Sequence, residues 1–236
     1  MPGMYYGMWW DSTYFLVLLG VLLSMAASSY MNSTYSRFSQ MRSRSGMNGA
    51  MAAGRLLQMA GIGDVRIERV AGNLTDHYDP KNKVLRLSEN VYAGTSVAAL
   101  GVAAHECGHA IQHARGYKPL ALRSWLVPAA NFGSKLSWPL ILIGVLLGYS
   151  QVLITLGIAM FSLAVLFQLV TLPVEFNASS RAAVALVDCG ILSNEEVGFT
   201  KKVLRAAAMT YVASAAGMIL QLLRLILLFG RRNDRR

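Results

Sequence analysis

The 236-residue chain is long enough for one sizeable domain or two small ones. Its composition differs from that of an ordinary soluble domain, because 54% of the residues are hydrophobic and only 14% are charged, against a usual charged share of about 25%. The formal net charge of +10 does not indicate nucleic-acid binding, because the basic residues are scattered around long apolar runs and form no stripe with interleaved aromatics. We therefore expect an integral membrane protein whose basic residues flank its spans.

The first predicted element is a membrane span over residues 9–29. A bilayer crossing needs about 20 predominantly apolar residues. This run has them, with the letters MWW and their two tryptophans at one end and Tyr30 at the other, an arrangement typical of the membrane interface. No Lys or Arg precedes the run, so it lacks the basic start of a cleaved signal peptide. Residues 1–30 are therefore predicted to be a retained membrane anchor.

Residues 31–124 predict a small folded core before the next apolar run. Met and Leu residues among alanines predict a short helix over residues 48–60, with Gly61 as its stop. Apolar and charged residues alternate over 65–70 and again over 83–87, after the turn letters DPKN, as they do in half-exposed strands. We expect a small β-hairpin or a three-stranded ribbon just before the histidines.

An alanine-rich helix follows in the letters TSVAALGVAAHECGHAIQHARG. Thr95 or Ser96 suits its N-cap, and Gly116 suits its C-terminal stop. His105 and His109 lie about one turn apart on this helix, so both rings project from one face and reach one metal ion at about 2.0–2.1 Å. The spacing therefore predicts two zinc ligands.

Glu106 lies about a third of a turn from His105. That position suits a carboxylate that takes a proton from the attacking water without ligating the metal. The letters HECGH thus have the HExxH pattern of two zinc ligands and a general base. In the structural alternative, backbone carbonyls satisfy both histidines. We favour the metal site, because ionisable groups in an apolar stretch cost free energy unless they have partners.

The two remaining histidines are weaker candidates for the metal. His113 lies about 12 Å beyond His105 along the same helix, so the three rings cannot converge on one ion. We expect His113 to support the site from outside or to serve in packing. His77 stands alone before a turn in the letters LTDHYDP, and contact with the site is a less favoured alternative for it.

Residues 125–174 predict a transmembrane hairpin. The run from 136 to 174 carries no charge and is long enough for two spans, with the letters GYSQ as their turn. Two spans return the chain to the side of the bilayer on which it started. Glu175 therefore lies on the same side as His105, as one metal site requires.

Glu175 is the favoured third ligand, because a catalytic zinc ion usually has three protein ligands and one open position. Asp188, Glu195 and Glu196 are the other downstream carboxylates considered as candidates. The last two are expected at an exposed helix start, where acidic residues favour the helix dipole.

Residues 175–205 are predicted to form a new helix that completes the core. Pro173 fits the first turn of such a helix. The small residues Ala178, Ala182 and Ala183 would allow it to approach the histidine helix closely.

The C-terminal region, 206–236, predicts a fourth membrane helix and a basic tail. Gln221 and Arg224 lie inside the apolar run, so its spanning character is less secure than that of the others. With four spans, sixteen of the 22 Lys and Arg residues fall in residues 31–124 and 175–205, which the positive-inside tendency places in the cytoplasm. The basic tail GRRNDRR opposes this orientation, and a final segment that does not span would remove the conflict.

The two cysteines, Cys107 and Cys189, are far apart and lack CxxC spacing. They indicate neither a disulfide scaffold nor a cysteine-built zinc site. We expect free, buried thiols.

The motifs together resemble a known family. The letters HECGHAIQH, a membrane hairpin and then PVEFNASSRA are similar to the membrane-bound neutral zinc metallopeptidases of bacteria described as YugP-like. LTDHYDP upstream and AAAMTYVA at 206–213 also resemble that family's pattern, so the likeness covers nearly the whole chain. HExxH with a later glutamate is more distantly similar to the HtpX-type and CAAX prenyl endopeptidases, which are gluzincins.

The resemblance implies that His105, His109 and Glu175 are the zinc ligands and that Glu106 is the catalytic base. In the wider group an aspartate commonly lies four residues after the glutamate ligand. That position is Ser179 here, so a carboxylate that orients either histidine cannot be carried over from it.

The candidates for the donor that stabilises the tetrahedral oxyanion are Tyr211, Arg181 and Arg205, and Tyr211 is the one assigned as a catalytic residue. Tyr211 could instead be an interfacial aromatic, and the arginines could be lipid-facing or positive-inside charges. The strand at 83–87 could bind an extended substrate by edge addition, or it could belong only to the protein's own sheet.

The sequence therefore predicts an integral membrane zinc endopeptidase. Its fold is expected to be mainly α-helical, with a zincin-like α+β core and about four transmembrane helices. Its expected partners are the lipid bilayer and a peptide or membrane-protein substrate, and its expected location is a bacterial plasma membrane with the active site on the cytoplasmic side. The alternative is a non-catalytic membrane protein that keeps zinc for structure or metal handling.

Overall fold

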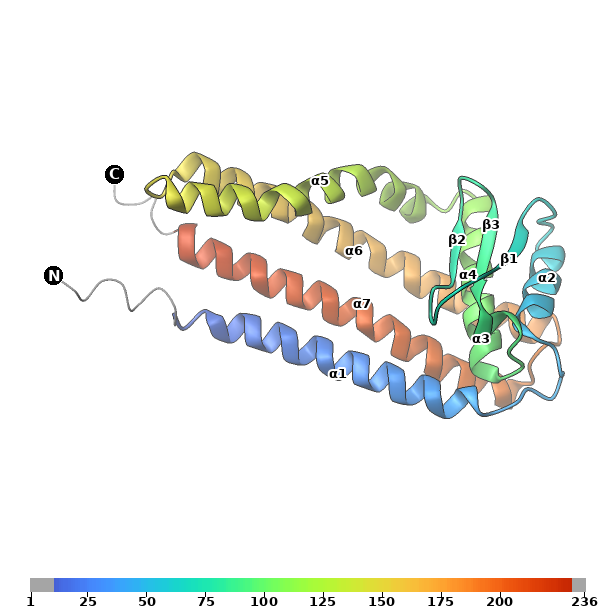
Figure 1. The fold of residues 1–236 in the computed structure, drawn as a ribbon. Coiled ribbons are helices and arrows are strands. Elements are labelled where there is room, and N and C mark those ends of the chain that lie inside the picture. Colours follow the sequence, from blue (N-terminus) through green and yellow to red (C-terminus); the bar gives the residue numbers. More distant parts are fainter. Residues whose placement is uncertain (1–10, 231–236) are drawn as a thin grey trace. The chain divides into compact units, whose positions relative to one another are not determined.

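The computed structural model describes residues 11–230, which form seven helices and one three-stranded sheet (Figure 1). In chain order the elements are α1 Tyr14–Ser39, α2 Gly49–Met59, β1 Arg66–Val70, β2 His77–Asp79, β3 Val84–Ser88, α3 Glu89–Tyr92, α4 Val97–Ala114, α5 Lys118–Leu146, α6 Gln151–Asp188 and α7 Asn194–Phe229. The predicted mainly helical fold with a small sheet is confirmed.

The described chain divides into two compact units. The helical unit contains the described residues up to Ala27, Arg123–Val170, and the described residues from Thr210 onward. The sheet unit contains Ser28–Leu122 and Thr171–Met209. The helices α1, α5, α6 and α7 therefore each contribute residues to both units.

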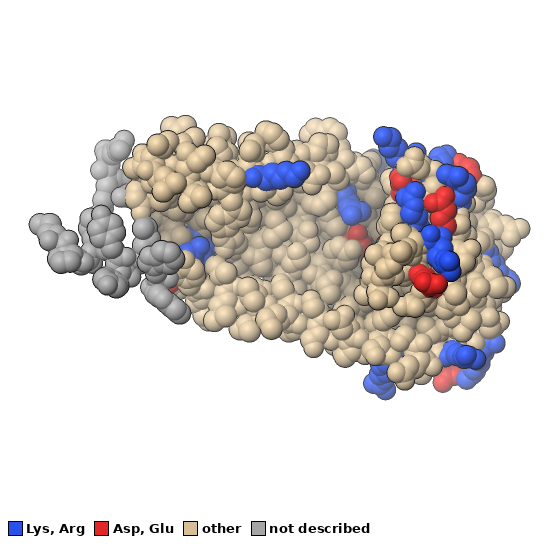
Figure 2. Space-filling model, viewed as in Figure 1, with Lys and Arg blue, Asp and Glu red and all other residues tan. Residues whose placement is uncertain are grey.

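Four described helices, α1, α5, α6 and α7, are long and apolar enough to cross a membrane. This agrees with the predicted number of spans. The expected start of the first span at Trp9 lies outside the described residues, as does all of the basic tail beyond Gly230. In Figure 2 the surface of the helical unit is mostly uncharged, whereas acidic and basic side chains gather over the strands of the sheet unit.

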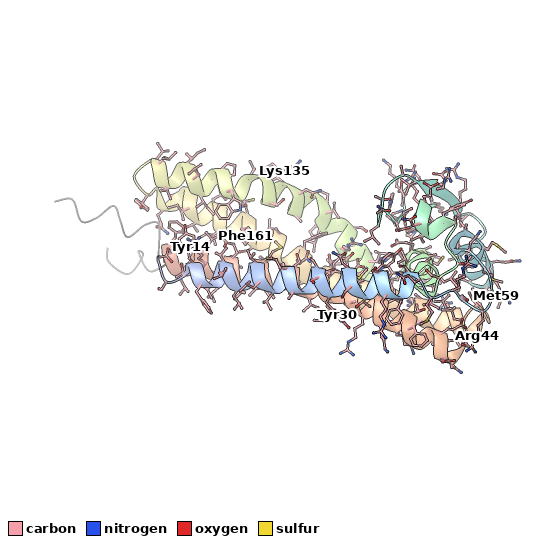
Figure 3. The ribbon with its side chains drawn as sticks, turned by 60° about the horizontal axis from the view of Figure 1, so that its bottom comes forward. Tyr14, Tyr30, Arg44, Met59, Lys135 and Phe161 are labelled. Atoms are coloured by element: carbon pink, nitrogen blue, oxygen red, sulfur yellow. The ribbon has the colours of Figure 1, made fainter. Side chains whose placement is uncertain are left out.

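The helical unit has a small apolar core formed by Ile141, Phe161, Val165 and Leu225. Phe161 points from α6 toward the interior of this unit (Figure 3). The helices α1 and α7 approach closely where two glycines meet, because a Cβ added to Gly20 would lie 3.1 Å from the Cα of Gly217. Small residues at such a contact allow two membrane helices to pack backbone to backbone.

Arg224, the charge inside the last apolar run, is paired within the helical unit. Its guanidinium Nη2 lies 3.6 Å from a carboxylate oxygen of Asp11, and its guanidinium carbon lies 4.2 Å from the centre of the Tyr14 ring. A charged side chain is tolerated at membrane depth when it finds such partners. The charge therefore does not argue against α7 as a span.

The helices α5 and α6 form the predicted hairpin, because α5 ends at Leu146 and α6 begins at Gln151. The predicted helix break at Pro173 is wrong, since α6 continues through this residue to Asp188. A proline inside a helix removes one backbone hydrogen bond, but neighbouring groups and local adjustment often satisfy the freed carbonyl in membrane proteins. The two residues after the proline, Val174 and Glu175, are buried, with 0% and 2% exposure.

The sheet has the strand order β1-β3-β2. β3 pairs in parallel with β1, for example Leu85 with Ile67, and antiparallel with β2, for example Leu85 with Tyr78. The prediction of a three-stranded ribbon is confirmed. The suggestion that the strand at 83–87 binds substrate along its edge is wrong, because β3 is the central strand, paired with β1 over Val84–Ser88 and with β2 over Val84–Arg86.

The core of the sheet unit lies between the sheet and the helices α2 and α4. Leu85 and Leu87 of β3 and Leu100 of α4 are fully buried there. The predicted helix ends are confirmed: Ser96 accepts a hydrogen bond from the backbone N–H of Ala99 at 3.1 Å, and Gly116 has the left-handed φ of 60° that favours glycine after a helix.

The start of α7 corrects one sequence expectation. Ser193 and Glu196 form a capping box, in which each side chain accepts a hydrogen bond from the other residue's backbone N–H. Glu196 is only 6% exposed and also accepts from the backbone N–H of Arg44 at 2.7 Å. The expectation of an exposed pair is therefore wrong for Glu196, whereas Glu195 is exposed and pairs with the Arg44 side chain, which Figure 3 labels.

Candidate metal centre

The helix α4 presents His105 and His109 side by side, with ring centres 4.8 Å apart. The approach of α6 to this helix depends on Gly108, because a Cβ there would lie 2.6 Å from the carbonyl oxygen of Ala178. Ala178 and Ala182 on α6 are almost completely buried. The prediction that small residues allow a close approach is confirmed, and glycine on α4 provides the other half of the contact.

This approach brings Glu175 of α6 to the two histidines. Its Oε2 lies 3.2 Å from the Nε2 of His105 and 3.6 Å from the Nε2 of His109. One ligand atom from each residue lies within 4.8 Å of the other two, so this group could hold a metal ion. The structure thus brings together the three residues that the sequence singled out, although His105 and Glu175 are 70 residues apart in the chain.

The outer nitrogen of each histidine ring has its own partner. The Nδ1 of His105 lies 3.1 Å from the hydroxyl of Ser179, and the Nδ1 of His109 lies 3.0 Å from the Oε1 of Gln112. An amide oxygen only accepts hydrogen bonds, so the Nδ1 of His109 carries a proton and donates it. Both Nε2 atoms face Glu175, which is the arrangement that imidazole ligands of a metal need.

Carboxylates around the ring set the electrostatics of His109. Burial by itself lowers the pKa of His109, but hydrogen bonds to Glu175 and Gln112 and the negative charges of Glu106 and Glu175 together raise it above its usual value. The same carboxylates that favour a proton on this ring would favour a divalent cation between the three side chains.

Glu106 is 8% exposed and does not belong to the three-residue group. Within residues 11–230, its carboxylate makes no hydrogen bond. Glu106 follows His105 directly in the sequence, and its role as a general base stays a prediction.

The structure places the other two histidines on the sheet side of α4. The Nδ1 of His113 lies 2.9 Å from the hydroxyl of Tyr78, which agrees with a packing role. His77 lies 2.8 Å from the carbonyl oxygen of Thr75 and 3.4 Å from a guanidinium nitrogen of Arg86. Neither ring belongs to the metal-binding group found among residues 11–230.

The three candidate oxyanion donors have different surroundings. The Nε of Arg181 donates to the Oδ1 of Asn177 at 2.7 Å, and its guanidinium carbon lies 5.8 Å from the centre of the Tyr117 ring. Arg205 is exposed. Tyr211 belongs to the helical unit, where its backbone carbonyl accepts from Gln168 at 3.5 Å. A role in oxyanion stabilisation stays a prediction for each of them.

Sequence reasoning missed Gln112 and Asn177. Gln112 is completely buried, and its amide nitrogen donates to the Oδ1 of Asn177 at 3.0 Å. The signal was present in the letters HECGHAIQH, because an amide three residues after His109 lies on nearly the same face of the helix.

The donor set fits zinc. Two imidazole nitrogens and one carboxylate oxygen are ligands that zinc prefers, and three protein ligands leave the open position of a catalytic site. The two thiols are not candidates: Cys107 lies 3.7 Å from the carbonyl oxygen of Ala53, and burial raises the pKa of its thiol. Both cysteines are free and buried, as predicted.

The helices and the group of His105, His109 and Glu175 thus define a membrane protein with a candidate metal centre. Residues 13–230 match the family described as "Putative neutral zinc metallopeptidase", and the chain belongs to this family, whose metal is zinc. A curated relative from Bacillus subtilis (strain 168), described as "Putative membrane protease YugP", is 48% identical over 220 residues, which are 93% of this chain and 97% of the relative. No solved structure matches the chain.

Proposed function

We propose that this chain is a membrane-embedded zinc endopeptidase of the gluzincin type. His105, His109 and Glu175 are its zinc ligands, and Glu106 is its general base. The observation that carries the proposal is the position of the Glu175 carboxylate, 3.2 Å and 3.6 Å from the inward nitrogens of the two histidines. Membership of a zinc metallopeptidase family supports the same chemistry.

The protein's own residues divide the work of hydrolysis. Zinc, when bound, supplies a Lewis acid that polarises the carbonyl of the scissile bond and makes water a better nucleophile. Glu106 takes a proton from the attacking water and then gives it to the leaving amine. Ser179 and Gln112 hold the two imidazole rings with their inner nitrogens free to ligate.

The fold around the site supports a zincin-like core. The helix with the HExxH pattern packs against a small mixed sheet whose central strand, β3, is buried. The third ligand comes from a second helix, α6, that packs against the first through Gly108 and Ala178. We propose that this arrangement forms the peptidase core and that Tyr211, Arg181 or Arg205 provides the oxyanion donor.

The proposed location is a bacterial plasma membrane, with the metal centre on the cytoplasmic side. Support comes from the bacterial relative described as a membrane protease and from the sixteen Lys and Arg residues of residues 31–124 and 175–205, which favour the cytoplasm. Membrane proteins, or segments released from them, are the proposed substrates, because the site lies on a chain with four apolar helices.

Two substitutions in the purified protein test the proposal. We expect Glu106→Gln to keep about one zinc ion per chain and to lower peptide hydrolysis by at least about 100-fold, because only the proton acceptor is lost. We expect Glu175→Ala to lose most of its bound zinc. Metal content and hydrolysis of casein or of a model membrane protein are the measurements.

The exposed Glu195→Gln is the matched control, and it should behave like the parent in both assays. Hydrolysis by Glu106→Gln at the parental rate would contradict the proposed base. Undiminished zinc in Glu175→Ala would contradict the proposed third ligand. A parent protein that binds zinc through Glu175 but cleaves no peptide substrate would favour the alternative of a non-catalytic zinc protein.

A further inference from the structure

Gln112 is a neutral amide that is completely buried in the sheet unit, one turn after His109. An amide in such a position costs free energy unless each of its polar groups finds a partner. The structure supplies three partners, and all of them belong to the metal centre or to the turn of α6 that carries Glu175.

The orientation of the Gln112 amide follows from these partners. Its Nε2 donates to the backbone carbonyl oxygen of Val174 at 2.8 Å. A carbonyl oxygen only accepts, so this end of the amide is the NH₂ group and the other end is the oxygen. That oxygen, Oε1, accepts from the Nδ1 of His109 at 3.0 Å. The proton on His109 is therefore held on the ring nitrogen that points away from Glu175.

The second donor hydrogen of Gln112 reaches Asn177, whose Oδ1 accepts it at 3.0 Å. The same Oδ1 accepts from the Nε of Arg181 at 2.7 Å. Val174 and Asn177 lie on either side of Glu175 in the sequence. One buried amide on α4 thus holds the α6 turn that bears the third ligand from both sides of that ligand.

His105 does not depend on this network, because its Nδ1 lies against the hydroxyl of Ser179. The outer end of the network is accessible, since Arg181 lines a cavity of about 370 Å³ between α2, α4 and α6. Met59 lies at this cavity and projects from the end of α2, as Figure 3 shows. The other end of the network, at Gln112, is completely buried. The hydrogen bonds therefore run from His109 through Gln112 and Asn177 to the guanidinium of Arg181.

We propose that Gln112 and Asn177 are positioning residues of the metal centre. They fix the tautomer and the ring orientation of His109 and set the separation of α4 and α6 at the Glu175 turn. This inference rests on the proposed function, because it takes His109 and Glu175 as zinc ligands. Outer partners of metal ligands commonly change metal affinity by about 10-fold to 100-fold when they are removed.

The Asn177 side chain gives the sharper test, because its Oδ1 accepts both hydrogen bonds, from Gln112 and from Arg181. Asn177→Asp keeps an acceptor for both Gln112 and Arg181, whereas Asn177→Leu has a similar size and no acceptor. We expect Asn177→Leu to weaken zinc binding about 10-fold to 100-fold, and Asn177→Asp to stay within about threefold of the parent.

Zinc affinity is measured by competition with a chromophoric chelator, and Co²⁺ absorption spectra report the geometry of the ligands independently of activity. Gln112→Met, which fills a similar volume, should weaken zinc binding and alter the cobalt bands in the same way as Asn177→Leu. Thr200→Val is the matched control. It removes another buried hydrogen bond to α4, the 3.0 Å contact with the carbonyl oxygen of Val97, and should leave zinc affinity and the cobalt spectrum unchanged.

The proposal is overturned if Asn177→Leu binds zinc with parental affinity and gives the parental cobalt spectrum. It is also overturned if Asn177→Asp is as defective as Asn177→Leu, or if Thr200→Val weakens zinc binding equally. Failure of the proposed function has a different signature, namely a Glu175→Ala protein that binds zinc as tightly as the parent. If Gln112→Met does not fold, the two Asn177 variants still decide the question.

Discussion

Ser179 differs in residue type from the expected pattern, but its side chain contacts a ring nitrogen of a histidine in the candidate metal centre. The wider group to which the motif is similar commonly has an aspartate at this position. Here the serine hydroxyl lies 3.1 Å from the Nδ1 of His105. A hydroxyl accepts the ring proton as a carboxylate does, but without a negative charge, so the partner is retained in a weaker form.

We predict that Ser179→Ala lowers zinc affinity by up to about 10-fold, because His105 loses its outer partner. Ser179→Asp should bind zinc at least as tightly as the parent, since a charged acceptor makes a stronger hydrogen bond to the ring. Chelator competition on both purified proteins measures the difference. Equal affinities for parent and Ser179→Ala would show that the contact does not support the metal site.

For single residues, the sequence alone was sufficient to predict which side chains lie together when their spacing along one helix places them there. His105, Glu106 and His109 are spaced by the helix itself, and no tertiary contact is needed to place them together. Gln112 and Asn177 were missed because an amide in a helix has no distinctive pattern. Its role depends on which side chains face it after two helices have packed.

The contact between α4 and α6 is the element on which the metal centre depends. Gly108 lies against the carbonyl oxygen of Ala178. Gly108 directly precedes His109, and Ala178 follows Glu175 by three residues. The small residues at this crossing determine how near Glu175 can come to the two histidines, because a side chain at Gly108 would have to push the two backbones apart.

We predict that Gly108→Ala destabilises the fold by about 1–3 kcal/mol through overpacking and weakens zinc binding at least several-fold. Thermal unfolding and zinc titration measure the two effects. The matched control is Gly198→Ala on α7, where an added Cβ meets no atom within 4 Å. That change should be neutral or slightly stabilising, since alanine favours a helix over glycine by about 1 kcal/mol. An unchanged zinc affinity in Gly108→Ala would argue against this account of the crossing.

The elements themselves followed the sequence well where local signals were strong. The caps at Ser96 and Gly116 and the turn before Gln151 were predicted correctly. Pro173 misled the prediction, because its local preference for a helix start was outweighed by the packing of the residues after it. The central position of β3 was also not predictable, since strand order depends on pairing between segments that share no local signal.

At the scale of the whole molecule, the ion pair between Arg224 and Asp11 connects the C-terminal end of α7 with the residues just before α1. The start of α1 and the end of α7 lie together there, so the first and last described residues belong on one side of the bilayer. This supports an even number of spans, and it favours the assignment of α7 as a membrane helix in spite of its charge.

Single-cysteine labelling tests this topology in intact cells. We predict that an impermeant thiol reagent labels Ser12→Cys and Gly230→Cys, whereas it labels Met59→Cys only after the membrane is permeabilised. The native Cys107 and Cys189 are buried, so they should contribute little background. Opposite labelling of Ser12→Cys and Gly230→Cys would mean that the number of spans is odd.

The amino-acid sequence by itself determined the class of membrane protein and the helix that carries the paired histidines and the adjacent glutamate, because composition, apolar run length and helical spacing are local properties of the chain. Only the tertiary structure decided that Glu175 reaches both histidines, that Ser179 and Gln112 contact their outer nitrogens, and that α6 passes through Pro173 without a break. These features depend on how closely α4 and α6 pack, and that distance is set by side chains from both helices at once.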